Sequence, residues 1–169
     1  MKIALPLVAA LLLCSCATLR PSKSALADLA PTKGNSVRGT VTFTQRGDHV
    51  LVVADVTGLS PGSHGFHIHE KGDCSADDAT SAGGHFNPLG KPHAAPGTTD
   101  RHAGDMPMLV ADANGVARLS TEIDVVTIAG GAADLLGKGL VVHKDADDFK
   151  TQPTGNSGAR VACGVIRAR

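Results

Sequence analysis

The part of this 169-residue chain with the clearest chemical potential is the stretch GFHIHE, in which His67 and His69 stand one residue apart. Residues i and i+2 of a β-strand project from the same face of the strand. Both imidazoles would therefore reach one metal ion, while Ile68 packs on the opposite side. The pair alone is weak evidence for a metal site, because polar residues alternate along many exposed strands.

Three further histidines and a carboxylate extend this pattern. His85, His93 and His102 are separated by eight and nine residues, and Asp105 comes three residues after His102. Three imidazoles with one carboxylate satisfy a tetrahedral zinc ion, and sites rich in imidazole also suit copper. His143 ends the apolar run LVV, where a strand can bring it back to the first pair. Any one of these histidines is as easily a solvated surface residue, so the prediction of a metal site depends on the whole set.

Short segments of period-two hydrophobicity predict the strands that must position these side chains. In the first of them, Val37, Val41 and Phe43 would face the same side. The tripeptide Ala-Asn-Gly at 113–115 predicts a hairpin. The predicted strands cover residues 37–44, 49–56, 64–69, 106–112, 116–123, 140–143 and 160–166. Many short strands joined by turns indicate an all-β domain, an antiparallel β-sandwich or barrel.

Two loops interrupt the predicted strands. Residues 70–105 are rich in Gly, Pro, Ser and Asp and show no sustained period. A loop of that length within a compact domain is usually functional, and this one contains His85, His93 and His102. A second loop of similar composition follows His143.

The N-terminal residues, MKIALPLVAALLLCSC, predict a targeting segment, with Lys2 before an apolar run too short to span a bilayer. The sequence LCSC resembles the cleavage box of bacterial lipoproteins, with a small residue just before Cys16. Residues 1–15 are therefore predicted to be a lipoprotein-type signal peptide, and Cys16 the acylated first residue of the mature chain. The alternative is an ordinary secretory signal, cleaved near Cys16 or Ala17. The mature domain leaves the cytoplasm in both cases, and acylation would place it in the periplasm or cell envelope of a bacterium.

The next segment, residues 16–34, is small, polar and interrupted by proline. Such a composition is typical of a flexible tether between membrane and domain. A short helix within SALADLA is the only regular structure expected there. The folded domain is predicted to cover residues 35–169.

The cysteines are informative about a disulfide bond, because the mature domain is predicted to lie outside the cytoplasm. Removal of Cys14 with the signal peptide and acylation of Cys16 would leave Cys74 and Cys163. An even pair of cysteines outside the cytoplasm predicts a disulfide bond. Closing so long a loop would stabilise the folded state by roughly 4–5 kcal/mol if the effect is entropic. The alternative is a pair of free, buried thiols.

Composition excludes one class of partner. Sixteen basic and sixteen acidic residues give a formal net charge of zero, which removes any overall attraction to nucleic acid. Four Phe and no Trp or Tyr leave few aromatic faces on which bases could stack. We therefore expect no nucleic-acid partner, and contact with a membrane only through the lipid anchor.

Five segments, in this order along the chain, resemble the copper–zinc superoxide dismutase family: GFHIHEKGDC, GGHFNPLGKPH, RHAGD, VVHKDADD and GNSGARVACGVI. The resemblance runs from about Ser36 to Ile166, and the spacings from His85 to Asp105 agree with the family pattern. It implies a Greek-key β-sandwich or flattened barrel with a long metal-binding loop and a long electrostatic loop. It also implies one copper and one zinc ion per subunit.

The resemblance assigns ligands to both metals. The copper ligands that it implies are His67, His69, His85 and His143. The zinc ligands that it implies are His85, His93, His102 and Asp105. The imidazole of His85 would therefore bridge the two ions.

The same motifs assign roles to residues around the ligands. Asp147 resembles the aspartate that hydrogen-bonds one ligand of each metal, here His67 and His93. Arg160 resembles the arginine that attracts and positions the anion beside copper. Cys74 and Cys163 match the family disulfide, whereas His64 matches a structural histidine that binds no metal. His49 lies in a turn and has no assigned role.

The implied activity is the dismutation of superoxide to oxygen and hydrogen peroxide, as an antioxidant defence in the cell envelope. One superoxide would reduce copper and a second would reoxidise it, while His85 takes up and returns a proton. Zinc, which has no redox chemistry, would hold His85 and the loop in place. The sequence does not fix the number of subunits, and a homodimer is one of the arrangements that we expect.

Two features depart from the eukaryotic members of the family. Cys74 sits closer to the His-x-His pair, and the segment from His143 to Arg160 is shorter. Both features resemble bacterial members, so we do not expect this chain to share the dimer contacts or the guiding-loop charges of the eukaryotic members.

Two rival functions fit part of the pattern: a periplasmic copper or zinc store or delivery protein, and a structural lipoprotein with an incidental zinc ion. The complete set of copper ligands and the presence of Arg160 argue against both.

Overall fold

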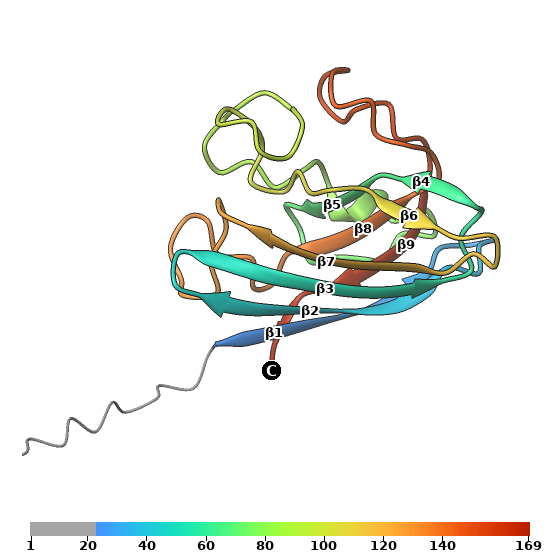
Figure 1. Ribbon diagram of the computed structural model, residues 1–169, viewed down its shortest axis with the longest axis horizontal. Helices are drawn as coiled ribbons and strands as arrows, with labels where there is room; N and C mark the ends of the chain where they lie inside the picture. Colours follow the sequence, from blue (N-terminus) through green and yellow to red (C-terminus); the bar gives the residue numbers. More distant parts are fainter. Residues whose placement is uncertain (1–22) are drawn as a thin grey trace, which may run out of the picture.

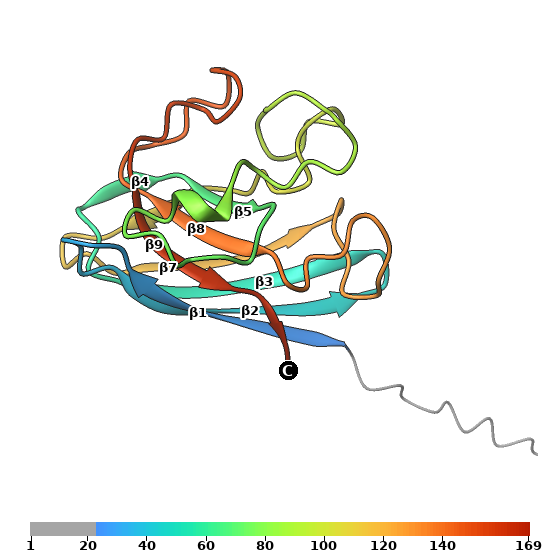
Figure 2. The same cartoon turned by 180° about the vertical axis from the view of Figure 1, so that it is seen from behind.

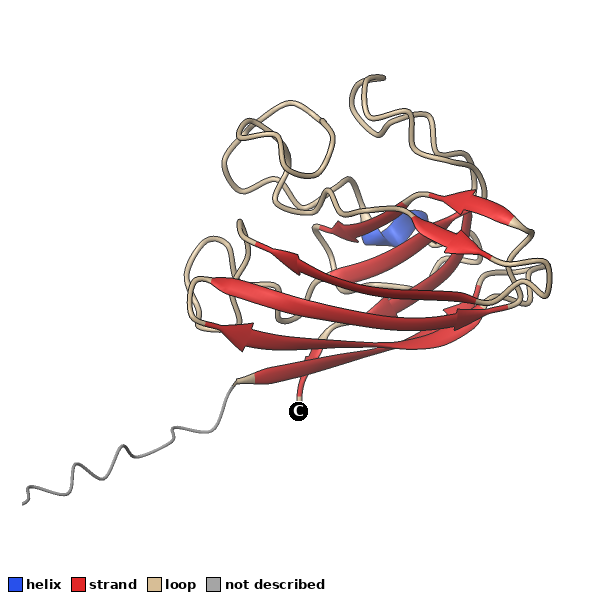
Figure 3. Cartoon of the chain, in the orientation of Figure 1, coloured by secondary structure: helices blue, strands red, loops and turns tan. Residues whose placement is uncertain are grey.

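Ten strands and one short 3-10 helix make up the regular structure of residues 23–169, the part of the chain that the computed structural model describes (Figure 3). The predicted signal peptide and Cys16 lie outside the described residues. The elements are β1 (Ser24–Pro31), β2 (Arg38–Arg46), β3 (His49–Thr57), β4 (Gly62–His64), β5 (Phe66–His69), η1 (Thr80–Ala82), β6 (Leu109–Ala111), β7 (Ala117–Ile123), β8 (Gly139–His143), β9 (Arg160–Val165) and β10 (Arg167–Ala168).

The strands form an antiparallel, nearly closed barrel, which confirms the predicted all-β class (Figure 1). Their order around the barrel is β4-β6-β7-β3-β2-β1-β9-β8-β5, with β10 added beside β1. The connection from β3 to β4 passes two intervening strands, and that from β7 to β8 crosses to the far half of the sheet. Such non-sequential neighbours are the mark of a Greek-key arrangement.

The period-two pattern correctly identifies the inward face of the longest strands. In β2 and β3 the fully buried residues include Val41, Phe43, Val50 and Val52, and the residues between them are half-buried or exposed. Apolar residues from every described strand except β4 and β10 contribute to a single core cluster. All members of this cluster lie between Ala25 and Ile166, so a chain without the predicted signal peptide keeps the whole described core.

The structure corrects the predicted tether of residues 16–34. Residues 24–31 are strand β1, and no helix forms within SALADLA. The strand pairs with β2 through Ala25↔Phe43 and Ala27↔Val41, and both alanines are fully buried. The small alanine side chains fit opposite large β2 side chains, so β1 fills the gap between β2 and β9 that a tether would leave open.

A second correction concerns the predicted strand 64–69. The chain divides at Gly65, so that His64 pairs with Leu109 of β6 while Phe66 pairs with Val142 of β8. A Cβ atom at position 65 would lie 2.6 Å from Oγ of Ser157. Glycine there lets the chain pass from one half of the sheet to the other, and this step joins the two ends of the strand order.

The two longest loops, residues 70–108 and 144–159, lie on the same side of the barrel (Figure 1 and Figure 2). The start of β1 and the C-terminal end of the described chain lie on the opposite side in both views. No helix of the described chain has the length and apolarity needed to cross a membrane.

Candidate metal centre

The long loop returns twice alongside the outer edge of β5. The Ile68 amide donates to the carbonyl of Gly104 (3.0 Å), and the Ile68 carbonyl accepts from the amide of Phe86 (2.8 Å). These bonds place His85 beside His69. A Cβ at position 104 would collide with the carbonyl of Ile68, so only glycine permits this close approach. The loop thereby carries candidate ligands back to the His-x-His pair.

Strand β8 delivers another histidine from the other side of β5. The His143 amide donates to the carbonyl of Gly65 (2.8 Å), and the register of β8 against β9 shifts between Val142 and His143. A bulge of this kind bends the strand and redirects the side chain that follows it. Four buried histidines thus form a first cluster whose ligand atoms all lie within 4.8 Å of one another: His67, His69, His85 and His143.

Hydrogen bonds identify which ring nitrogens of the first cluster are free. His69 and His143 donate through Nδ1 to the carbonyls of Gly83 (2.9 Å) and Gly158 (3.3 Å). In a neutral imidazole the other nitrogen then holds a lone pair. The two Nε2 atoms lie 3.4 Å apart, and two lone pairs at that distance repel each other unless a cation lies between them.

Two more nitrogen atoms of this cluster have no hydrogen-bond partner. Nδ1 of His67 and Nε2 of His85 are buried and unpartnered within the described chain. Buried polar atoms of native proteins are rarely left without a partner. An all-imidazole set with its lone pairs gathered at one place suits copper, so the residues present fit that metal.

The second cluster consists of three imidazoles around a carboxylate. Nδ1 of His85 and of His93 each lie 2.9 Å from Oδ1 of Asp105, and Nδ1 of His102 lies 3.4 Å from it. Zinc–nitrogen bonds of about 2.0–2.1 Å place tetrahedral ligand atoms about 3.3 Å apart. The amides of Ala94 and His102 fix the other carboxylate oxygen, each at 3.1 Å. The second cluster therefore fits zinc in both donor type and size.

One ring belongs to both clusters. His85 directs Nδ1 to Asp105, and its unpartnered Nε2 belongs with the first cluster. A single imidazole therefore joins the two groups of ligand atoms.

The carboxylate of Asp147 connects the clusters from behind. Oδ2 accepts from Nε2 of His67 (2.7 Å), and Oδ1 accepts from Nε2 of His93 (3.0 Å) and from the amide of Phe149 (2.7 Å). A Cβ at Gly155, where φ is +68°, would collide with this carboxylate and with the His93 ring. One buried carboxylate thus sets the tautomer of a ring in each cluster, as outer carboxylates do around metals.

The clusters differ in their affinity for protons. Burial lowers the pKa of His67 to about 4 and that of His143 to about 3. Burial also opposes the charging of His93, but the carboxylates of Asp105 and Asp147 raise its pKa to about 9. Burial therefore keeps His67 and His143 in the neutral, ligating form, whereas the two carboxylates favour the charged form of His93.

These shifts predict how the metal-free protein responds to acid. As the pH falls below 6.5, the unfolded chain protonates at His67 and His143, while the folded protein resists until about pH 4 or below. The free energy of unfolding therefore decreases through this window. The contribution of His93 has the opposite sign; it is complete below pH 6.5 and is lost only as the pH rises through about 9. We expect the midpoint of thermal unfolding of chelator-treated protein to fall by roughly 10 °C between about pH 6.5 and pH 4. A midpoint that stays constant over this window would contradict the prediction.

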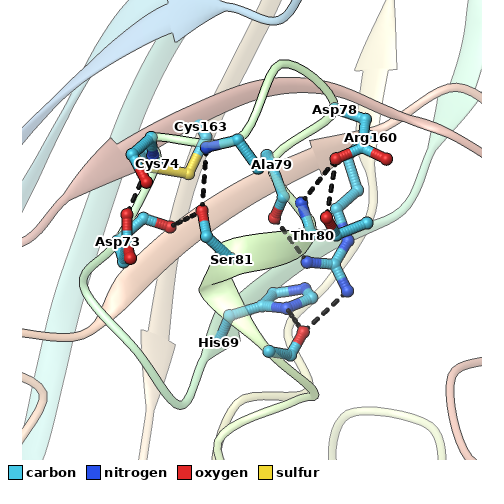
Figure 4. The surroundings of a disulfide bond; sticks show 12 residues. His69, Asp73, Cys74, Asp78, Ala79, Thr80, Ser81, Arg160 and Cys163 are labelled. Atoms are coloured by element: carbon cyan, nitrogen blue, oxygen red, sulfur yellow. Dashed lines mark hydrogen bonds between the residues drawn. A yellow bond between two sulfur atoms is a disulfide. The ribbon is translucent and has the colours of Figure 1, made fainter.

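Arg160 fastens the start of the long loop beside the first cluster (Figure 4). Its guanidinium donates through Nη1 to the carbonyl of Ala79 and through Nη2 to that of Gly83, both at 2.6 Å. The Gly83 carbonyl also accepts from His69. Arg160 and a member of the first cluster are therefore joined through one carbonyl oxygen.

The predicted disulfide is present. Cys74 and Cys163 are bonded, with a sequence separation of 89 residues. Cys163 lies three residues after Arg160 on β9, and Figure 4 shows that both side chains reach the loop segment that contains Cys74 and Ala79. The loop is thus held to β9 both by a covalent bond and by Arg160.

Two histidines lie outside both clusters. His64 is buried, with Nδ1 2.9 Å from the carbonyl of His143 and Nε2 2.8 Å from that of Ser60. It therefore binds backbone, as a structural histidine does. His49 lies at the β2–β3 hairpin beside Asp48 (2.7 Å).

Sequence reasoning missed another residue that supports the site. Arg101 is buried and contacts Asp124, the residue that follows β7, while its Nη1 donates to the carbonyl of Thr98 (2.7 Å). It anchors the residue before His102 to the barrel. An isolated arginine in a long loop gives no sequence signal for such a role.

The fold and the site together define a class of protein: an antiparallel β-barrel that carries two adjoining metal-ligand clusters with a shared imidazole. Comparison with known proteins agrees. The family model described as copper/zinc superoxide dismutase (SODC) matches residues 37–166. The chain is 45% identical over 139 residues to the copper–zinc superoxide dismutase 2 of Mesembryanthemum crystallinum, covering 78% of this chain and 88% of the relative. The crystal structure of the clock protein EA4 matches with a TM-score of 0.80 and 40% identity, covering 88% of this chain and 96% of that one.

The chain belongs to the copper/zinc superoxide dismutase family. It is an enzyme of that class, with copper and zinc as its cofactors.

Proposed function

We propose that this protein converts superoxide to oxygen and hydrogen peroxide at a copper ion joined to zinc through His85. The observation that carries the proposal is the pair of buried clusters that share this ring, with Nδ1 of His67 and Nε2 of His85 unpartnered within the described chain. A metal store would need ligands, but it would not need one ring held between two unlike donor sets.

Each cluster is assigned to one metal by its donors. His67, His69, His85 and His143 would hold copper, and His85, His93, His102 and Asp105 would hold zinc. Copper, when bound, supplies the one-electron chemistry that the reaction requires. Burial keeps the rings of His67 and His143 neutral, and Asp147 orients His67 and His93.

The chain's own residues also serve the substrate and the proton. The half-buried guanidinium of Arg160 provides a fixed positive charge close to His69, which favours approach of a small anion. The Nδ1 atom of His85 faces Asp105, so its Nε2 is the ring atom free to hold a proton between the two electron transfers.

The direct test is metal analysis with an activity assay. Purified protein should contain copper and zinc in equal amounts and should consume superoxide, and protein depleted of copper should recover activity when copper is added. Full copper and zinc occupancy without dismutase activity would favour storage or delivery of metal and would reject the proposal.

Arg160→Ala should lower kcat/KM for superoxide by roughly 10- to 100-fold and weaken its dependence on ionic strength, because a fixed positive charge beside the site is removed. Both metals should be retained. Arg38→Ala, which removes an exposed cation at the start of β2, serves as the matched control. Loss of copper from the Arg160 variant would show that the residue acts only by holding the loop.

The proposed setting is the cell envelope of a bacterium, with the chain anchored through an acylated Cys16. The motif LCSC after an apolar run supports this, as does a disulfide typical of oxidising compartments. Expression in a bacterial host should give a membrane-bound product with the mass of an acylated chain. Cys16→Ser should abolish both the membrane association and the added acyl mass. A cleaved, soluble product from the unaltered chain would instead indicate an ordinary secretory signal. Association as a homodimer is a further proposal, to be decided by the mass of the purified protein in solution.

A further inference from the structure

Three basic residues meet where the two ends of the described chain run side by side. The amide of Arg169 donates to the carbonyl of Ser24 (3.0 Å), and β10 pairs with β1 through Leu26↔Arg167. Residues paired across two strands project from the same face, and the intervening Ala25 points into the core. Arg167 and Arg169 therefore project outward together. Exposed Lys23, just before β1, completes a group that we call the terminal cation cluster: Lys23, Arg167 and Arg169.

The charges of the terminal cation cluster are not neutralised locally. None of its three members forms an ion pair with a residue of the described chain, in contrast to the exposed cations Lys33 and Arg118. Residues 1–22 contain Lys2 and Arg20 and no acidic residue. Within the described chain, the acidic residue that shares a groove with the cluster is Asp28. A terminal carboxylate on Arg169 would cancel one charge and still leave an excess.

The cluster borders apolar surface. Lys23 and Arg169 line a cavity of about 290 Å³ together with Ile128 and Leu136. Arg167 and Arg169 also line a second groove, of about 410 Å³, together with Leu26. A cationic rim above an apolar floor matches a phospholipid, which combines an anionic phosphate with hydrocarbon.

The two ends of the described chain, which carry the cluster, lie on the opposite side of the barrel from the protruding parts of the metal-bearing loops, as Figure 1 and Figure 2 show. The start of the first loop comes nearer, since Cys74 lines the same groove as Arg167. Cys16 is only seven residues before Lys23, and seven residues span at most about 25 Å when fully extended. An acyl chain on Cys16 would therefore hold the cluster close to a bilayer surface.

We infer that the terminal cation cluster is a contact surface for anionic phospholipid headgroups, and that this contact turns the metal-bearing loops away from the membrane. The choice of a membrane as the partner rests on the proposed anchor at Cys16. Superoxide would then reach the copper site from the aqueous side, without passing the negative surface of the bilayer, which repels anions.

The test uses the chain from residue 16 onward with Cys16→Ser, which contains all ten strands of the described residues and the whole described core and has no acyl group. It should bind vesicles of equimolar phosphatidylcholine and phosphatidylglycerol at low ionic strength, and should not bind phosphatidylcholine alone. The combined variant Lys23→Gln, Arg167→Gln, Arg169→Gln should lower the partition coefficient by roughly 100-fold, at about fivefold per cation. Dismutase activity should be unchanged.

The matched control removes three other exposed cations, Arg38→Gln, Lys71→Gln and Lys150→Gln, and so has the same net charge. It should bind like the parent chain. Equal losses in both variants, or no binding to the anionic vesicles, would overturn the inference. Equally tight binding to heparin would identify a general polyanion site, and concentration-dependent dimers lost in the first variant would identify a contact between copies of the chain; either result would also overturn it. The assay omits the acyl group, so its outcome is separate from that of the Cys16→Ser experiment.

Discussion

His85→Ala should remove both metals and reduce dismutase activity by more than about 100-fold. Mutation of a residue that only hydrogen-bonds a metal ligand already lowers metal affinity or activity by about 10- to 100-fold, and loss of the ligand itself should cost more. The ring supplies Nδ1 to the cluster around Asp105 and Nε2 to the cluster that contains His143. Alanine leaves each cluster one ligand short. Copper and zinc per subunit should therefore fall together when measured by elemental analysis, and the circular dichroism of the barrel should be unchanged.

The informative controls for this variant lie elsewhere in the same chain. His102→Ala should deplete zinc first, because His102 belongs to the second cluster alone. His49→Ala, at the β2–β3 hairpin, should alter neither metal. If His85→Ala kept normal copper while losing only zinc, the ring would belong to one site, and the assignment of a shared ligand would be wrong.

The site shows what spacing can and cannot predict. The i, i+2 rule placed His67 and His69 on one face without further information, because strand geometry is local. The convergence of His85 and Asp105 on that pair depends on backbone bonds such as Ile68 to Gly104. Every residue has those backbone groups, so residue types do not reveal such pairings. The ligand sets and the position of Asp147 came from resemblance to a family, and the geometry brings the same residues together.

The fold shows a similar division. Strands with large apolar side chains at every second position, such as Val41 and Phe43, were predictable because this alternation marks the face that is buried. Strand β1 was not, because its inward residues Ala25 and Ala27 are small and alanine favours helices. Its position depends on the bulk of the β2 residues opposite. That is a tertiary effect, which local propensity does not contain.

Removal of the disulfide should cause a large loss of stability. Cys74→Ala with Cys163→Ala opens a loop defined by a separation of 89 residues. Restored freedom of the unfolded chain lowers the free energy of unfolding by roughly 4–5 kcal/mol, which corresponds to a fall in thermal midpoint of roughly 10–20 °C for a domain of this size. Metal-free samples should be compared, so that changes in metal affinity do not enter the midpoint.

Activity should fall as well, for a reason that the contacts supply. The loop that Cys74 fixes to β9 carries the carbonyls of Ala79 and Gly83, which hold Arg160, and Gly83 also accepts from His69. Without the covalent bond these carbonyls lose a constraint on their position, so Arg160 and one first-cluster ring are held less firmly. Unaltered protein treated with a reductant is the matched control, because it leaves the buried Cys163 side chain in place. The reduced protein should show the same drop in thermal midpoint and activity. If only the double variant loses stability, the cause is a packing defect at position 163 and not the missing covalent bond.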